Sequence, residues 1–202
     1  MAGTFPASWE EVALVTIQVK GGTAYQYAAI TETIDISEPD YPGEGVATVS
    51  GGRIWKRSAQ EDGEVTLEMY PINIDSAANN GGLAQDFVGG TQDSSQPLSS
   101  DIAWAASINR ERDRFIIAIM WTNDTAQTSA MATTTATDQT ALRFYAKECR
   151  IISHKTAFTD GIVKTTVTLK FPDMNKAGST KSWAWQSTDD TDTSPIGALT
   201  YT

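Results

Sequence analysis

The segment from Val163 to Phe171 alternates without interruption between two kinds of side chain, one mostly apolar and the other polar. A helix of about 3.6 residues per turn would scatter both kinds around its axis, whereas a strand places them on opposite faces. The alternation therefore predicts a strand with one buried face. Ala141 to Phe158, just before it, is also β-like, and it is much longer than the usual ~5–6 residues. Since Gly161 separates the two segments, we predict a long antiparallel hairpin.

Three other segments also predict strands. Val12 to Val19 is rich in β-branched residues and ends before Gly21-Gly22, so Tyr25 to Ile30 can return as its hairpin partner. Glu64 to Tyr70 alternates apolar and polar side chains. Arg114 to Trp121 is nearly continuously apolar, which is typical of a strand covered on both faces. We expect this last strand to be central.

One short helix is predicted, over Leu83 to Val88. Its apolar residues recur at helical spacing, Asn79-Asn-Gly-Gly precedes it, and Gly89-Gly90 can end it. The segment from Glu38 to Gly45 contains two prolines and two glycines, so we expect a loop there and no regular element.

The length of 202 residues fits one domain, because single cores stop growing only near ~250–300 residues. We expect this domain to span residues 1–172. Residues 122–140 are rich in Thr, Ala and Ser with little to bury, which predicts an exposed loop that can become ordered on assembly. Residues 173–202 are polar and predict a C-terminal extension that packs only partly on the domain.

Charge and cysteine content narrow the function. The formal net charge is −10, so the surface repels nucleic acid from most directions, and sequence-specific DNA binding is not expected. Cys149 is the single cysteine, which rules out an intramolecular disulfide and a thiolate zinc cluster. Residues 1–20 lack a signal-peptide pattern and no run approaches the ~18 apolar residues of a membrane span, so we expect an intracellularly made protein without a membrane partner.

The residues that could support catalysis do not form a known arrangement. Cys149 has one candidate base, His154, and a separation of five residues along one strand places the two side chains on opposite faces. The usual nucleophile-elbow, phosphate-loop, zinc-protease and dinucleotide motifs are absent from the sequence. We therefore predict that the protein is not an enzyme and has no catalytic residues and no cofactor.

Two acidic groups could suggest other chemistry. Asp189 to Asp192 resembles part of a calcium loop, but it lacks the central glycine and the closing glutamate, so we interpret it as a solvated acidic stretch and predict no metal site. Glu61, Asp62 and Glu64 could pair as acid and base for glycoside hydrolysis, although their position around a turn explains them without chemistry.

Aromatic and basic residues indicate contacts with other molecules or with the core. Arg110, Arg112 and Arg114 alternate with acidic residues, which fits ion pairs between subunits or, more simply, a solvated loop. The six tryptophans are dispersed, so core and interface anchoring explains them better than a single carbohydrate platform. They are Trp9, Trp55, Trp104, Trp121, Trp183 and Trp185.

Several blocks of the sequence resemble the tail tube proteins of long-tailed phages and related archaeal viruses. The first are Asp62-Gly-Glu-Val-Thr-Leu-Glu-Met-Tyr-Pro71 and Tyr25-Gln-Tyr-Ala-Ala-Ile-Thr-Glu-Thr-Ile-Asp35. The C-terminal half contributes Arg143-Phe-Tyr-Ala-Lys-Glu-Cys-Arg-Ile-Ile-Ser153, Phe158-Thr-Asp-Gly161 and Lys164-Thr-Thr-Val-Thr-Leu-Lys-Phe-Pro172. The resemblance covers most of Tyr25 to Pro172, and these are strand patterns.

The resemblance implies a mainly β fold, an antiparallel β-sandwich or half-barrel with one short flanking helix and a long hairpin. It also implies a structural virion protein whose hexameric rings stack into a tail tube, a conduit for viral DNA in which DNA passes without specific binding. Partners would be further copies and other tail proteins. An acidic chain fits a negative wall along which DNA slides, and it equally fits a halophilic source.

The two faces of the predicted hairpin receive different roles. We expect the polar face to line the lumen or contact a neighbouring subunit; it includes Lys164, Thr166, Thr168 and Lys170. We expect the other face to pack inward through Val163, Val167, Leu169 and Phe171.

Two other functions remain open from the sequence. The tryptophan content and acidic loops also fit a carbohydrate- or receptor-binding β-sandwich module. A capsid decoration or tail-completion protein would share the β composition but form a different oligomer.

Overall fold

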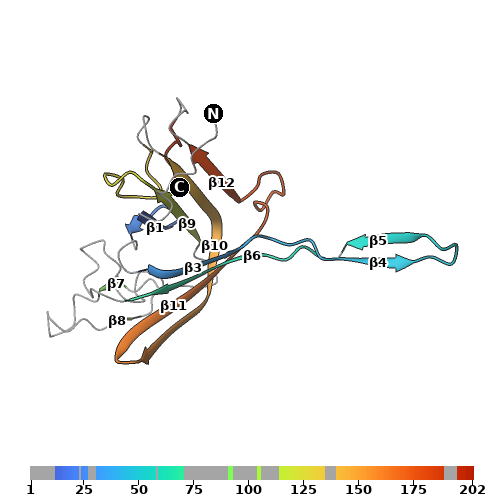
Figure 1. Ribbon diagram of the computed structural model, residues 1–202, viewed down its shortest axis with the longest axis horizontal. Helices are drawn as coiled ribbons and strands as arrows, with labels where there is room; N and C mark the ends of the chain where they lie inside the picture. The colour runs from blue at the N-terminus through green and yellow to red at the C-terminus, as the bar shows by residue number, and fades with distance from the viewer. Residues whose placement is uncertain are drawn as a thin grey trace.

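The computed structural model describes residues 12–22, 24–26, 31–57, 59–70, 91–92, 104–105, 114–134, 140–188 and 195–202. All regular secondary structure in these ranges is β-strand, so the protein is mainly β, as predicted. Figure 1 shows a curled sheet from which a narrow two-stranded arm projects to one side. These ranges include no helix that is long and apolar enough to cross a membrane.

Twelve strands are found in these ranges. They are β1 (Val12–Val19), β2 (Ala24–Gln26), β3 (Thr31–Ser37), β4 (Gly43–Ala47), β5 (Arg53–Arg57), β6 (Gly63–Met69), β7 (Thr91–Gln92), β8 (Trp104–Ala105), β9 (Phe115–Thr122), β10 (Ala141–Thr159), β11 (Ile162–Phe171) and β12 (Trp183–Thr188).

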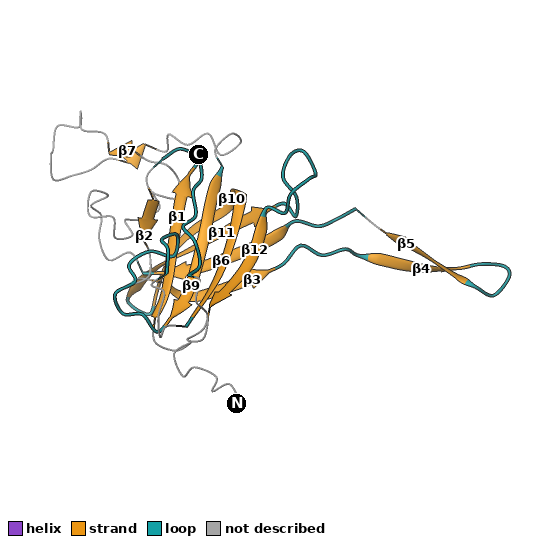
Figure 2. Ribbon diagram, turned by 90° about the horizontal axis from the view of Figure 1, so that it is seen from above, coloured by secondary structure: helices purple, strands orange, loops and turns teal. Residues whose placement is uncertain are grey.

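The main sheet is antiparallel and is organised around β10. Its strand order is β2-β1-β9-β10-β11-β6-β3, and β12 also pairs with β10. β9 lies along one edge of β10, while β12 pairs with residues 141–146 and β11 with residues 150–159. Because one 19-residue strand has a different partner along each part of its length, it joins the two halves of the curled sheet, as Figure 2 shows.

The predicted hairpin and central strand are confirmed. β10 and β11 pair through a two-residue turn, in which Asp160 and Gly161 both have positive φ, 54° and 80°. Asn, Asp and Gly are the residues that adopt this conformation at the lowest cost. β9 lies between β1 and β10, and every residue of it except Trp121 is buried. The predicted helix at Leu83–Val88 falls outside the described residues.

The curled sheet encloses an inner core on its concave side. β1, β6, β9, β10 and β11 all contribute alternate residues to it, as their sequence alternation requires. Its members are Val15, Ile17, Val65, Leu67, Met69, Phe115, Ile117, Ile119, Phe144, Ala146, Cys149, Ile151, Val167, Leu169 and Phe171. At the edge of this core a Cβ on Gly63 would lie 2.3 Å from the Phe171 ring, so the ring packs there only because residue 63 is glycine.

A second core covers the opposite face of β1 and β9. Here Ile116, Ala118 and Met120 of β9 pack against Met131, in the loop that follows β9, and against Ile196, much later in the chain. The sequence predicted residues 122–140 as an exposed loop, but Ala130 and Met131 are 0% and 6% exposed. The composition of the segment was misleading because the apolar partners of Ala130 and Met131, such as Leu14 and Ile116, lie outside the segment.

The C-terminal residues also belong to the folded body. β12 extends the main sheet beside β10, and Ile196 and Tyr201 are buried in the second core. The described part of residues 173–202 therefore packs more extensively than the sequence indicated.

Arg143 holds these outer segments together. Its side chain is fully buried and donates to Gln186 Oε1 of β12 at 2.6 Å and 2.9 Å, to the carbonyls of Ala130 and Ala132 at 3.3 Å and 3.2 Å, and to the Gly197 carbonyl at 2.6 Å. Burial lowers its pKa to about 10, so the guanidinium stays protonated at neutral pH. One side chain thus links a strand, a loop and the C-terminal segment.

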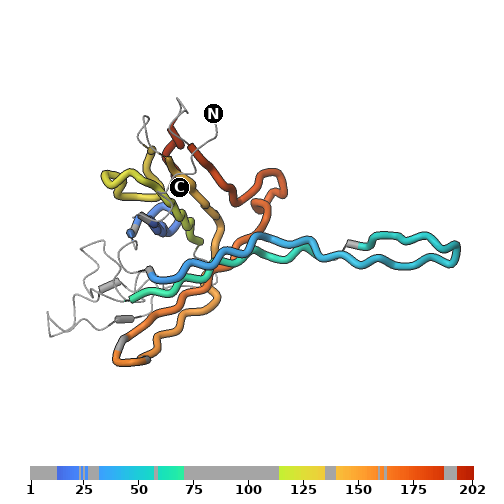
Figure 3. The backbone as a smooth tube through the Cα atoms, viewed as in Figure 1, coloured from blue at the N-terminus to red at the C-terminus, as the bar shows by residue number. Residues whose placement is uncertain are grey.

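The arm differs from the rest of the fold. β3 and β6 pair in the main sheet, and the chain between them continues outward as the β4–β5 hairpin, which pairs only with itself in the described structure. The tube view of Figure 3 shows this pair leaving the sheet as one continuous ribbon. We call residues 43–57 the arm and residues 38–42 with 59–62 the arm base.

Candidate assembly surfaces

The polar face of the hairpin lies on the convex side of the sheet. Lys164, Thr166, Thr168 and Lys170 are all partly buried on this face. On the neighbouring strand β6, Glu64, Thr66 and Glu68 stand opposite Lys170, Thr168 and Thr166. The face is therefore a continuous polar surface built from two adjacent strands.

Lys164 is the best-connected residue of this face. Its Nζ lies 2.8 Å from Glu32 Oε2 of β3 and 3.5 Å from Glu68 Oε1 of β6, and 5.3 Å from the centre of the Tyr70 ring. The hydrogen bond to Glu32 raises the pKa of Lys164, and the same bond lowers the pKa of Glu32. Lys170 lies 3.9 Å from Glu64. The two lysines are thus matched by carboxylates of the same chain.

The other face of the hairpin changes character along its length. Val167, Leu169 and Phe171 are fully buried in the inner core. Near the turn, Val163 is 39% exposed and its cross-strand partner Phe158 is 73% exposed. The hairpin extends beyond the body that would cover it, so its tip carries an apolar pair in solvent.

The arm is exposed on both faces. On one face Val46 and Ile54 are cross-strand partners, 45% and 62% exposed, beside the pair Glu44 and Lys56. On the other face Trp55 is 65% exposed. Val49 is also fully exposed in the turn between the two strands. A two-stranded hairpin with four large apolar side chains in solvent is marginal by itself, so the arm has the composition of a contact surface.

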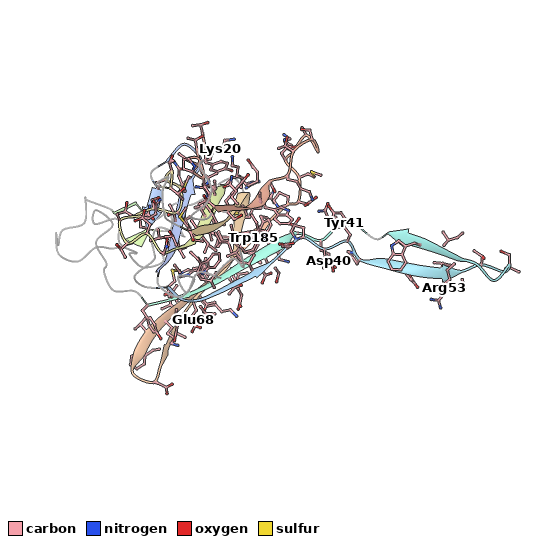
Figure 4. The ribbon with its side chains drawn as sticks, turned by 45° about the horizontal axis from the view of Figure 1, so that its top comes forward. Lys20, Asp40, Tyr41, Arg53, Glu68 and Trp185 are labelled. Atoms are coloured by element: carbon pink, nitrogen blue, oxygen red, sulfur yellow. The ribbon has the colours of Figure 1, made fainter. Side chains whose placement is uncertain are left out.

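Two glycines shape the tryptophan face. Gly45 is the cross-strand partner of Trp55, and a Cβ on Gly43 would lie 2.5 Å from the indole ring. The ring therefore lies across bare backbone, which leaves its outer surface free for another molecule. Arg53 is on the same face two residues before Trp55, and it forms no ion pair with the residues that the structure describes. Figure 4 shows Arg53 on the arm, far from the body.

A buried carboxylate ties the arm base to the body. Asp173 is 3% exposed. It accepts hydrogen bonds from the Tyr41 hydroxyl at 2.5 Å and from Trp183 Nε1 at 2.8 Å, and it forms an ion pair with Lys181. Trp185 Nε1 also donates to Glu38 Oε1 of the arm base at 2.7 Å. We call Tyr41, Asp173, Lys181 and Trp183 the clasp; Figure 4 shows Tyr41 where the arm leaves the body.

The clasp strongly favours an ionised Asp173. Burial alone would raise its pKa, but the bonds from Lys181, Tyr41 and Trp183 outweigh burial and hold the pKa well below the usual range of an aspartate. The bond to Asp173 in turn raises the pKa of Lys181. Asp173 thus links Tyr41 of the arm base to Lys181 and Trp183 of the body through one ionised group.

The candidate catalytic pair does not form a reactive site. Cys149 is fully buried in the inner core, its Sγ donates to the Ala146 carbonyl at 3.3 Å, and burial raises the pKa of the thiol, so the nucleophilic thiolate is disfavoured. The argument that placed Cys149 and His154 on opposite faces was wrong. A bulge between Ile151 and Ser153 shifts the register, so His154 stands opposite the core residue Val167.

Other predicted groups take no part in a site. Among the described residues no three His, Cys, Asp or Glu side chains are placed to hold a metal ion. Glu61 and Asp62 belong to the arm base, and Glu64 lies on β6 beside Lys170. Asp189 to Asp192, Arg110 and Arg112 fall outside the described residues.

Sequence reasoning missed the arm. Its prolines and glycines at positions 38–45 predicted a loop, but β4 begins at Gly43. One signal was present: residues 53–57 include the strand-favouring residues Ile54 and Trp55, and Gly51-Gly52 can form a tight turn before them. Strand 53–57 could have been found from that pattern, although its glycine-rich partner could not.

Comparison with known proteins gives a likeness in solved structures only. No family model matches the sequence, and no curated protein matches it. One similar chain comes from the extended sheath-tube complex of an extracellular contractile injection system called PVC, with 11% identity, a TM-score of 0.49, and coverage of 93% of this chain and 95% of that chain.

Two further structural matches are more distant. A chain from the tube-terminating cap of the anti-feeding prophage is 10% identical, with a TM-score of 0.45 and coverage of 86% of this chain and 88% of that chain. Hcp1 from Flavobacterium johnsoniae is 9% identical, with a TM-score of 0.34 and coverage of 78% and 89%.

Proposed function

We propose that this protein is a structural subunit that assembles with copies of itself into a tube. The observation that carries the proposal is the arm, a two-stranded hairpin that projects from the folded body with Val46, Ile54 and Trp55 in solvent. Isolated two-stranded hairpins are marginal in water, and three or more strands or a packing partner make them stable. The arm therefore has its stable environment in contact with another molecule.

The hairpin tip supports the same conclusion independently. Phe158 and Val163 are exposed apolar partners at the end of β10 and β11. In the described structure no strand pairs with the outer edge of β3 or of β2, the two ends of the main sheet. Open edges and apolar tips favour aggregation unless a defined neighbour covers them, and closing a ring of subunits is one way to cover them.

The polar face of the hairpin has a role in this proposal. Lys164, Thr166, Thr168 and Lys170, with the acidic residues of β6 beside them, line the lumen or meet a neighbouring subunit. Since each lysine lies near a carboxylate of its own chain, this face is close to neutral locally and does not hold DNA tightly. Val163 belongs to the exposed tip, and the buried Val167, Leu169 and Phe171 fix the strand that presents the face.

The finer form of the proposal follows from the sequence resemblance. The subunits close into rings of six, the rings stack as the tail tube of a virion, and viral DNA passes through the lumen without specific binding. The protein acts with other tail proteins, is made in the host cytoplasm, and needs no cofactor or catalysis.

The test is negative-stain electron microscopy of the purified protein over a concentration series. We expect rings or hollow tubes with a central channel, and class averages of end views to show six-fold symmetry. A variant in which residues 44–56 are replaced by a short Gly-Ser linker removes the arm and leaves β3 and β6 joined. It should stay folded but lose tubes.

A persistent monomer at all concentrations would overturn the proposal. If that monomer bound glycans on an array, the protein would be a carbohydrate-binding module. A closed oligomer that never stacks would indicate a decoration or completion protein instead.

A further inference from the structure

Between β3 and β6 the positive and negative charges lie in different segments: the arm is basic and the arm base is acidic. The arm carries Arg53, Lys56 and Arg57 against Glu44, a formal charge of +2. The arm base carries Glu38, Asp40, Glu61 and Asp62, a formal charge of −4. The chain as a whole is at −10, so the arm is a basic segment on an acidic protein.

One exposed basic side chain, Arg53, lies on the tryptophan face of the arm. Lys56 stands opposite Glu44 on the other face of the arm, so its charge has a neighbour of opposite sign. Arg53 forms no ion pair with any described residue and is exposed. Arg and Trp are the residues enriched most strongly among those that dominate binding energy at protein interfaces.

The acidic arm base is exposed as well. Asp40, Glu61 and Asp62 are all exposed, and the Glu61 amide donates to the Asp40 carbonyl at 3.1 Å, so they lie together. Asp40 Oδ1 accepts from the Tyr41 amide at 2.7 Å, and Glu61 and Asp62 form no ion pair within the described chain. Tyr41 is 47% exposed at this position and adds apolar area.

We infer that the Arg53–Trp55 face of the arm docks on the acidic arm base of a second copy of this chain. This inference rests on the proposed function and names its contact. A basic arm and an acidic arm base on one chain are complementary between copies, since each copy offers both. The contact is head-to-tail, and such contacts propagate into rings or filaments, whereas a two-fold contact closes at a dimer.

The test is a pair of charge reversals, Arg53→Glu and Glu61→Lys, with Lys20→Glu as control. Lys20 lies on the body, far from the arm (Figure 4). Sedimentation and electron microscopy give the protein concentration at which assemblies form, and circular dichroism checks the fold. We expect each reversal to raise that concentration by about tenfold or more. Lys20→Glu should behave like wild type.

Mixing the two variants provides the decisive measurement. In a mixture the carboxylate introduced at position 53 of one variant meets the ammonium introduced at position 61 of the other, and the two wild-type surfaces meet each other. The formal charge of the arm in Arg53→Glu is 0 and that of the arm base in Glu61→Lys is −2, so the restored attraction is local to these two positions. Assembly should therefore return to within a few-fold of the wild-type concentration, as expected when complementary charges are restored. It should also weaken as salt is raised.

The outcomes separate the two proposals. If wild type never assembles, the proposed function fails. If wild type assembles and Arg53→Glu assembles equally well, only the arm contact is overturned. If Arg53→Glu assembles normally but loses retention on a single-stranded DNA column, the arm face binds nucleic acid and this inference is also overturned.

Discussion

β9 and the two strands of the arm lie in opposite surroundings. β9 has every residue but Trp121 buried, between two strands and between two cores. β4 has four of its five residues exposed, and it pairs only with β5 in the described structure. The body is stabilised because its apolar side chains are buried within the same chain. The apolar side chains of the arm stay exposed and are available for contact with another molecule.

The comparison separates two kinds of mutational effect. Burying one large apolar side chain stabilises a protein by about 1.5–3 kcal/mol, so substitutions in the body should lower the free energy of unfolding. Substitutions in the arm should change assembly and leave that free energy nearly unchanged. The following variants test this separation, beginning with the largest expected effect.

Val167→Asp should prevent folding. Val167 is fully buried in the inner core, and an unpaired carboxylate there costs on the order of 4 kcal/mol or more, a large part of a domain's stability. Circular dichroism and electron microscopy should show neither a folded protein nor rings. Ala157→Asp, on the exposed part of the same hairpin, is the control and should fold. Rings formed by Val167→Asp would contradict the assignment of the hairpin faces.

Arg143→Met should destabilise the body by about 2–4 kcal/mol in urea unfolding. The substitution keeps apolar volume but leaves Gln186 and the carbonyls of Ala130, Ala132 and Gly197 without their donor. The C-terminal residues should also become more sensitive to limited proteolysis. Arg150→Met removes an exposed arginine from the same strand and should cost less than about 0.5 kcal/mol. Equal effects would mean that Arg143 does not hold the segments together.

Asp173→Asn should lower stability by about 1–3 kcal/mol, because the clasp loses its charge. The folded-state pKa of Asp173 is held below its unfolded value, so its contribution is present above about pH 4 and is lost as the pH falls toward the folded pKa. Wild type should therefore lose more stability than Asp173→Asn between about pH 4 and pH 2.

The control for the clasp is Asp160→Asn in the hairpin turn, where asparagine also tolerates positive φ. Its acid profile should follow that of wild type. Parallel acid profiles of wild type and Asp173→Asn would show that the clasp contributes nothing.

Lys164→Met should have the smallest effect, a loss of stability no larger than that of an ordinary surface substitution, because its ion pairs with Glu32 and Glu68 are partly exposed and screened by salt. Lys155→Met, on an exposed position of β10, is the matched control. Melting temperatures at low and high salt give the comparison. A loss well above that of the control at high salt would mean that the polar face supports the fold as a core does.

The strands whose side chains are buried within the body were predictable from the sequence. β1, β6, β9 and the β10–β11 hairpin follow their alternation or apolar runs, because burial on one or both faces selects those residues directly. The turn at Asp160-Gly161 was equally predictable, because its positive φ angles restrict the residue types that can occupy it.

Three features were not predictable for physical reasons. The arm is exposed on both faces, so no burial pattern marks β4. Ala130 and Met131 bury against a sheet face supplied by distant residues, which local composition does not reveal. The bulge beyond Ile151 reverses the parity on which the placement of His154 depended, and a bulge leaves no clear sequence signal here.

Because Cys149 is buried in the inner core, the opening of that core can be measured through the native thiol, without an introduced label. The chain has one thiol, and it is 0% exposed on the concave side of the sheet. A thiol-specific reagent can react only when β10 separates from its neighbours, so the rate of modification reports the opening of that core. A variant of the arm should leave this rate unchanged, and a variant that loosens the body should accelerate it.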